Sequence, residues 1–483
     1  MAASPPAVPT LSRTLRSRHV ALISIGGIIG AGLFVGSSAN IATVGPAVLV
    51  SYLVAGVLMF LVMRMLTEMA AADPNAMSFA DHARAGLGPW AGFVCGWLYW
   101  YFWVVVVGIE AIAGAVILRT WIELPVWQIG LGLMVLLTAT NLLSTRSYGE
   151  FEFWFASIKV AAIVAFVVIA GSYALGLGSP TGPTLANLVA HRGFAPFGSA
   201  AVLAGVTGIV FSMTGAEIAT VVAAESSEPA SAIAAMTTGL IVRILLFYVL
   251  SVLCILAVVP WNTIEPGTSP FAVALESIGI PFAATIMNLI VLVAVLSCLN
   301  SGLYITSRML FGLAAHGDAP RSLVALDARR VPTRAILIGT VFGYLAVLAS
   351  VASPQRLFTF LVNASGAIML VIYLLIALAQ IRRRRAAEQG GRAQLPVRMW
   401  LFPWLSYATV VGIALVLASM LFRPAERAQL AASALSVAAV LAAYAWRQRA
   451  RPVGLSSAEM NARASGPPKV PEPAARSRQD RHC

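Results

Sequence analysis

The sequence predicts an all-α integral membrane protein with about twelve transmembrane helices. Three observations support this fold class. The chain is 59% hydrophobic and only 11% charged, whereas soluble domains carry roughly 25% charged residues. About twelve apolar runs are long enough to cross the hydrocarbon core of a bilayer. The first and sixth runs are both rich in glycine and small polar residues, which is typical of two inverted five-helix repeats with discontinuous first helices.

The expected domains follow from where these apolar runs begin and end. Residues 1–18 form a cytoplasmic tail, 19–446 the transmembrane domain, and 447–483 a disordered cytoplasmic tail rich in Arg, Pro, Ala and Ser. Within the domain, 19–176 is the first repeat, 198–380 the second, and 401–446 two accessory helices. The predicted spans are 19–40, 46–69, 90–118, 125–143, 152–176, 198–222, 234–259, 281–312, 335–352, 357–380, 401–422 and 427–446.

The net charge of +13 indicates orientation in a bilayer rather than binding to nucleic acid. Arginines gather before span one, between spans eight and nine, and between spans ten and eleven, which all fall on one side of a twelve-span chain. The positive-inside bias therefore places both termini in the cytoplasm. Residues 1–18 lack the apolar core of a signal peptide. The four cysteines show no disulfide or metal spacing, so no metal or other cofactor is expected.

Span one contains the stretch S-I-G-G-I-I-G-A-G-L-F-V-G from Ser24 to Gly36. Backbone inside a bilayer is left open only beside a cavity, because hydrocarbon offers no hydrogen bonds. Glycines at this density predict such an opening, where free N–H groups and a half-helix dipole suit a carboxylate. Alternatively, the small residues only allow close packing of a neighbouring helix. The candidate substrate-binding residues are Gly26, Gly27, Gly30, Ala31 and Gly32.

Three charged residues in spans two and three stand out: Arg64, Glu68 and Glu110. Arg64 and Glu68 are spaced i, i+4 and are predicted to pair near the cytoplasmic face, as a gate contact or as an interfacial ion pair. Glu110 lies about two-thirds of the way across span three, where a carboxyl costs at least a few kcal/mol and usually faces the bundle interior. Glu110 is therefore a substrate-binding candidate, with a protonated structural carboxyl as the alternative.

Lys159 is the candidate coupling residue. The chain has two lysines, and the other, Lys469, lies in the predicted tail. An amine loses its proton on desolvation whereas guanidinium does not, so an embedded lysine suits reversible proton transfer. The alternative is that Lys159 snorkels to the cytoplasmic headgroups. Ser297 and Ser301 of span eight are expected to line the region facing Lys159.

Span six repeats the features of span one. Gly208, Ser212 and Gly215 interrupt its apolar pattern, and Glu217 follows at membrane depth. Beyond it, Glu225 lies in an acidic loop that departs from the positive-inside bias, which suggests a role in closing the inner vestibule.

These tracts resemble the amino acid, polyamine and organocation transporters, and among them the bacterial amino acid permeases. The resemblance covers nearly the whole predicted domain and rests on the span-one glycine motif and on G-A-E at 215–217. The tracts F-V-G-S-S, Y-G-E-F-E-F-W and M-L-F-R-P-A are most similar to the 4-aminobutyrate (GABA) permeases.

The resemblance implies a proton-coupled symporter of the bacterial cytoplasmic membrane that imports GABA or a related omega-amino acid by alternating access. It places the substrate carboxylate on the span-one backbone, the amine near Phe211, Ser212, Glu217 and Glu110, and Lys159 where sodium-coupled relatives hold a cation. Gly108 and Ile109 depart from the family, whose members tend to carry a proline there. The resemblance therefore leaves the identity of the substrate undetermined.

Two other functions are weighed against this one. The first is a proton-coupled permease for alpha-amino acids such as proline or aromatic or cationic residues. The second is a ligand-sensing membrane receptor, which the lack of a signalling domain disfavours. An enzyme is not expected, since the spans contain no paired aspartates, no H-E-x-x-H and no embedded Ser/His pair. The sequence makes no prediction of oligomeric state.

Overall fold

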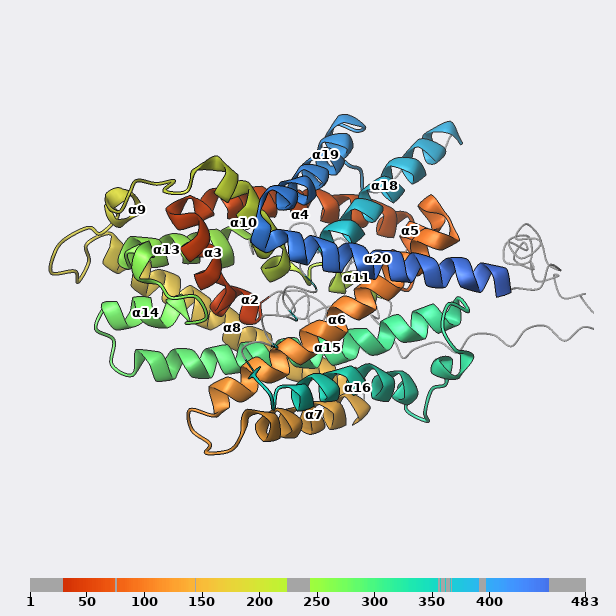
Figure 1. Ribbon diagram of the computed structural model, residues 1–483, viewed down its shortest axis with the longest axis horizontal. Helices are drawn as coiled ribbons and strands as arrows, with labels where there is room; N and C mark the ends of the chain where they lie inside the picture. The colour runs from red at the N-terminus through yellow and green to blue at the C-terminus, as the bar shows by residue number, and fades with distance from the viewer. Residues whose placement is uncertain are drawn as a thin grey trace, which may run out of the picture.

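The computed structural model describes residues 29–73, 76–143, 145–223, 244–354, 357, 361, 365, 367–390 and 397–450. All regular secondary structure in these ranges is helical, which confirms the predicted all-α class. Long helices run side by side along the molecule, with shorter helices and loops at its two ends (Figure 1). The predicted tail 1–18 and residues 451–483 lie outside the described residues.

The apolar composition produces helices of membrane-spanning length. Seven helices in the described ranges are long and apolar enough to cross a bilayer. Three shorter apolar helices lie at Gly198–Met213, Leu246–Val258 and Thr333–Ala349. The chain is therefore a multi-pass membrane protein. The seven candidate spans are Gly36–Ala72, Pro89–Leu118, Val126–Leu143, Tyr148–Ala174, Ala283–Ala315, Trp404–Phe422 and Glu426–Arg449.

The helix bounds lie within three residues of the prediction for spans two, three, four, eight, nine and eleven, whereas the helix of span ten runs over Ile368–Gln389 instead of 357–380. The helices follow in the order of the sequence. They are α2 (Ala31–Phe34), α3 (Gly36–Val44), α4 (Val48–Ala72), α5 (Phe79–Leu87), α6 (Pro89–Leu118), α7 (Val126–Leu143), α8 (Thr145–Ala174), α9 (Asn187–Ala190), α10 (Gly198–Met213), α11 (Ile218–Ala223), α13 (Ser251–Val258), α14 (Pro270–Ser277), α15 (Ala283–Ala315), α16 (Thr333–Ala349), α18 (Ile368–Gln389), α19 (Trp404–Ser419) and α20 (Pro424–Ala450). A π-helical turn at Ile244–Leu250 precedes α13, and short 3-10 turns lie at Gly45–Ala47, Trp261–Thr263, Arg321–Val324 and Met420–Phe422.

The centre of the bundle is the contact between α6 and α15 (Figure 1). The two helices approach closely at Gly302, where an added Cβ would lie 2.8 Å from the Val107 side chain. Helices α7 and α16 pack on one side of this pair, and α8 packs along α15. This arrangement brings Glu110 of α6, Ser297 of α15 and Lys159 of α8 into the protein interior, where each is buried.

The predicted pair between Arg64 and Glu68 is wrong. Glu68 instead accepts hydrogen bonds from the Arg384 guanidinium at 3.3 Å and the Gln380 amide at 3.0 Å, both on α18. Arg64 donates to the backbone carbonyl of Arg398. An i, i+4 ion pair between Arg64 and Glu68 would contribute only a few tenths of a kcal/mol. Helix α18 instead buries the Glu68 carboxylate and supplies it with two hydrogen-bond donors.

A second polar cluster joins the ends of α5, α15 and α20, which converge in Figure 1. Asp318 follows α15 and is buried, and both Arg84 of α5 and Arg447 of α20 donate to its carboxylate. Helix α20 continues to Ala450, beyond the predicted end of the last span at 446. Within this extension, Arg447 pairs with the buried carboxylate of Asp318.

Candidate functional site

The helix of span six is interrupted between α10 and α11. Thr214 has an extended backbone with ψ of 143°, and Gly215 has a φ of 123°, a conformation that side-chain-bearing residues rarely adopt. The Glu217 carboxylate turns back and accepts from the Gly215 N–H at 3.1 Å. The Ser212 carbonyl, near the open end of α10, accepts from the Tyr248 hydroxyl at 2.7 Å. Side chains thus satisfy backbone groups that the helix leaves unpaired.

Glu217 is completely buried and both of its carboxyl oxygens have protein partners. In addition to Gly215, the Tyr99 hydroxyl of α6 donates to Oε1 at 3.1 Å and the Tyr373 hydroxyl of α18 donates to Oε2 at 3.0 Å. The carboxylate therefore links the interrupted helix to α6 and α18. Its geometry suits holding the interruption in place, because its oxygens are already occupied by donors.

The described part of span one also begins in non-helical backbone. Gly30 is extended, with φ of −132° and ψ of −158°, and α2 starts at Ala31 and lasts one turn before a break at Val35. Gly30 allows close approach to span three, since an added Cβ would lie 2.9 Å from Glu110 Oε1. A Cβ added at Gly32 would lie 2.9 Å from the Ser212 Cα. The two interrupted segments are therefore in direct contact. Gly26 and Gly27 lie outside the described residues.

Glu110 lies beside the start of α2 and is 4% exposed. The backbone N–H of Ala31 and the thiol of Cys298 face its carboxyl group. Its second oxygen, Oε2, has no hydrogen-bond partner among the described residues. A buried carboxyl oxygen without a partner is costly, so this atom is a candidate to receive a donor from a ligand.

Lys159 is fully buried and points into the bundle, so it does not snorkel to the membrane surface. Its Nζ donates to the Ile29 carbonyl at 2.9 Å and to Ser297 Oγ at 2.7 Å. The Glu152 carboxylate lies 4.0 Å from the same nitrogen. The amine thereby joins Ile29, in the non-helical backbone before α2, to α15. The sequence predicted the contact of Lys159 with Ser297 but missed Glu152, which lies seven residues earlier on the same helix face.

The remaining predicted residues have other partners. Ser301 hydrogen-bonds with the Tyr148 hydroxyl at 3.1 Å. The Ser212 hydroxyl donates to the Ile209 carbonyl within its own helix. Phe211 packs its ring edge-on against Phe102. Glu225 lies outside the described residues.

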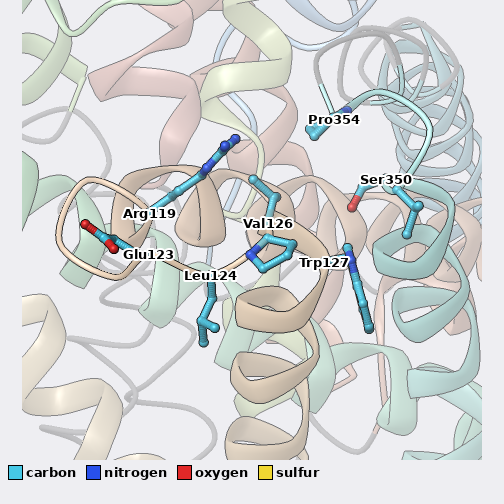
Figure 2. Close-up of a pocket in the computed structure, with 9 residues that line it drawn as sticks. Arg119, Glu123, Leu124, Val126, Trp127, Ser350 and Pro354 are labelled. Carbon is cyan, nitrogen blue, oxygen red and sulfur yellow. The ribbon is translucent and has the colours of Figure 1, made fainter.

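A surface pocket of about 540 Å³ lies elsewhere, at the ends of α6 and α16 (Figure 2). Arg119 and Glu123 lie on one side of it and Trp127 and Ser350 on the other. None of the predicted site residues lines this pocket.

An all-helical, multi-pass membrane fold with paired helix interruptions and buried ionisable groups defines a membrane transporter. The comparisons with known proteins specify the family. The model of the amino acid permease family matches residues 19–451. The chain belongs to this family, within the amino acid, polyamine and organocation superfamily. It is a permease and not an enzyme.

Individual relatives agree with this assignment. The chain is 46% identical to the gamma-aminobutyric acid permease of Bacillus subtilis, over 90% of this chain and 93% of the relative. It is 43% identical to the gamma-aminobutyric acid permease of Escherichia coli, over 87% and 91%. It is 39% identical to the aromatic amino acid transport protein AroP of Corynebacterium glutamicum, over 87% and 91%.

Solved structures show the same fold at low sequence identity. The crystal structure of a mutant of the Eremococcus coleocola manganese transporter has a TM-score of 0.56 and is 13% identical. The match covers 88% of this chain and 92% of that chain. At this identity the similarity establishes the fold alone.

Proposed function

We propose that this protein is a proton-coupled symporter that imports GABA or a related omega-amino acid by alternating access. The observation that carries the proposal is the placement of Lys159. Its buried amine donates to the Ile29 carbonyl, in the non-helical backbone before α2, and to Ser297 on α15. The substrate class is supported by the 43–47% identity to relatives named as GABA permeases.

The protonation state of Lys159 determines how tightly span one is held against α15. As an ammonium group, Lys159 has three donors and a charge that Glu152 balances at 4.0 Å. When it loses its proton, the hydrogen bond to the Ile29 carbonyl weakens, because charge-assisted hydrogen bonds are roughly twice as strong as neutral ones. In this proposal, protonation joins span one to α15, and proton release loosens that contact.

The substrate amine is assigned to Glu110 rather than to Glu217. Glu110 Oε2 is buried and without a partner in the described part of the chain, whereas both oxygens of Glu217 accept hydrogen bonds from the protein. The substrate carboxylate is assigned to the span-one backbone from Gly26 to Gly32. These two partners, Glu110 and the span-one backbone, lie on different helices. They therefore suit a ligand such as GABA, whose amine and carboxylate are well separated.

The proposed architecture is two inverted five-helix repeats, at 19–176 and 198–380, followed by two accessory helices. The interruptions of spans one and six, which meet at Gly32 and Ser212, support this arrangement. The arginine distribution supports cytoplasmic termini in a bacterial inner membrane.

Uptake by proteoliposomes under an imposed pH gradient tests the proposal. Labelled GABA is expected to accumulate when the inside is alkaline, and unlabelled GABA is expected to compete better than proline or aromatic or cationic amino acids. Stronger competition by an alpha-amino acid would favour the second candidate function, which the 39% identity to an aromatic amino acid transport protein supports. Binding without uptake of any amino acid would indicate a receptor.

A further inference from the structure

Glu152 is a buried carboxylate whose only role in the proposed function is to balance the charge of Lys159. It lies on α8, seven residues before Lys159, and both residues are fully buried. Seven residues are two helical turns, or about 10 Å along the axis, on the same face. Helical side chains lean towards the N-terminus of their helix, so the long Lys159 side chain reaches back to within 4.0 Å of Glu152 Oε1.

Ser297 of α15 connects the two groups by hydrogen bonds. Lys159 Nζ donates to Ser297 Oγ at 2.7 Å, and the Ser297 hydroxyl donates in turn to Glu152 Oε1. Both donors point the same way, from the amine through the hydroxyl to the carboxylate. This is the order of donors and acceptors that transfer of one proton from Lys159 to Glu152 requires.

Other polar side chains also surround Glu152. The side chains of Ser301 and Asn300 lie near the carboxylate, and the Tyr148 hydroxyl is 3.1 Å from Ser301 Oγ. Glu152 Oε2 has no hydrogen-bond partner among the described residues. Tyr148 lies near the N-terminal end of α8, which the proposed orientation places at the cytoplasm.

Two other titratable side chains of the described residues lie near Lys159, namely Glu110 of α6 and the Cys298 thiol of α15. Helix α7 contributes the amide of Asn141, which donates to Asn300 at 2.8 Å. Among the described residues, Glu152 is therefore a carboxylate that the amine reaches through hydrogen bonds, while Glu110 faces Gly30 and the start of α2.

We infer that Glu152 receives the coupling proton from Lys159 through Ser297 and releases it towards the cytoplasm; the inference rests on the proposed function. The ammonium of Lys159 gives a proton to Ser297 Oγ while the Ser297 hydroxyl gives its own proton to Glu152. The step leaves a neutral amine, an intact hydroxyl and a protonated carboxyl group. No other reactant is needed. Release of the proton from Glu152 to water then resets the carboxylate.

The test compares net uptake with exchange in proteoliposomes. In exchange of labelled for unlabelled GABA at equal pH, the transporter changes conformation while GABA and the proton are both bound. Net uptake, in contrast, requires proton release in every cycle. Glu152→Gln keeps the shape of the side chain and removes the acceptor. Net uptake is expected to fall by about 100-fold, a typical contribution of a positioned proton-transfer group, while exchange falls far less.

Matched variants separate this role from a structural one. Glu150→Gln makes the same change two residues away on α8, at a partly exposed position, and is expected to keep both activities. Ser297→Ala removes the bridging hydroxyl and is expected to reproduce the selective loss of net uptake, which keeps the inference testable if Glu152→Gln does not fold.

Three results bear on the inference. Undiminished net uptake by Glu152→Gln would overturn it. Equal loss of net uptake and exchange in both Glu152→Gln and Ser297→Ala would also overturn it, in favour of a purely structural ion pair. If the wild-type protein takes up GABA without responding to the pH gradient, the proposed proton coupling itself fails, which is a separate outcome.

Discussion

Replacement of Gly32 by alanine tests the contact between the two interrupted segments. The new Cβ would lie 2.9 Å from the Ser212 Cα and 3.0 Å from its Cβ, whereas carbon atoms pack at about 3.5–4.0 Å. The nearest atom belongs to the backbone of α10, so relief requires that α2 and α10 move apart. Overpacking of this kind costs about 1–3 kcal/mol. If this cost adds to the free-energy barrier of the rate-limiting conformational change, turnover slows by about five- to 150-fold.

The assay is initial uptake of labelled GABA by proteoliposomes with matched amounts of protein. Gly36→Ala is the control, because its Cβ would meet only the Ala31 carbonyl oxygen at 3.8 Å. This control introduces the same methyl group into the same glycine motif without a clash. An uptake rate of Gly32→Ala equal to that of the wild type would refute the reasoning. An equal loss of uptake rate in Gly36→Ala would refute it as well.

Three further predictions concern stability in detergent. Tyr373→Phe removes a donor to the buried Glu217 and should lower the unfolding free energy by about 1.5–3 kcal/mol; Tyr101→Phe on α6 is the control, and equal melting temperatures would contradict the assignment. Burial, with a smaller effect of Arg383, lowers the pKa of His82 on α5 to about 3, so the folded protein takes up no proton there while the unfolded chain does below about pH 6.5. The wild type should therefore lose about 2 kcal/mol relative to His82→Gln between pH 7.5 and pH 5, and parallel pH profiles would contradict this. Asp318→Asn removes the carboxylate shared by two arginines and should lower the melting temperature; the effect should shrink when Arg447 is also replaced, and additive losses would argue against a shared cluster.

The parts of the site that depend on local sequence were predictable. Glycine and small polar residues in spans one and six indicate backbone that departs from a continuous helix, and both positions are non-helical in the structure. Lys159 was a predictable candidate because the predicted transmembrane domain otherwise uses arginine at its basic positions, so its one lysine is a distinct choice. These inferences need only the residue type and its depth in the membrane.

The parts that depend on distant partners were not predictable. The donors to Glu217 come from Tyr99 and Tyr373, more than one hundred residues away on either side, and no spacing rule connects them. The same reason explains the error at Glu68, whose partner lies 316 residues further on. Glu152 was within reach of sequence reasoning, because its spacing of two helical turns from Lys159 places both on one face.

The measurement that tests the central claim most directly is gradient-driven uptake of labelled GABA by the wild type and Lys159→Ala. The account predicts that the wild type accumulates GABA when the inside is alkaline, and that Lys159→Ala loses accumulation while binding is partly retained. Undiminished proton-driven uptake by Lys159→Ala would contradict the account, because the buried amine would then have no part in coupling.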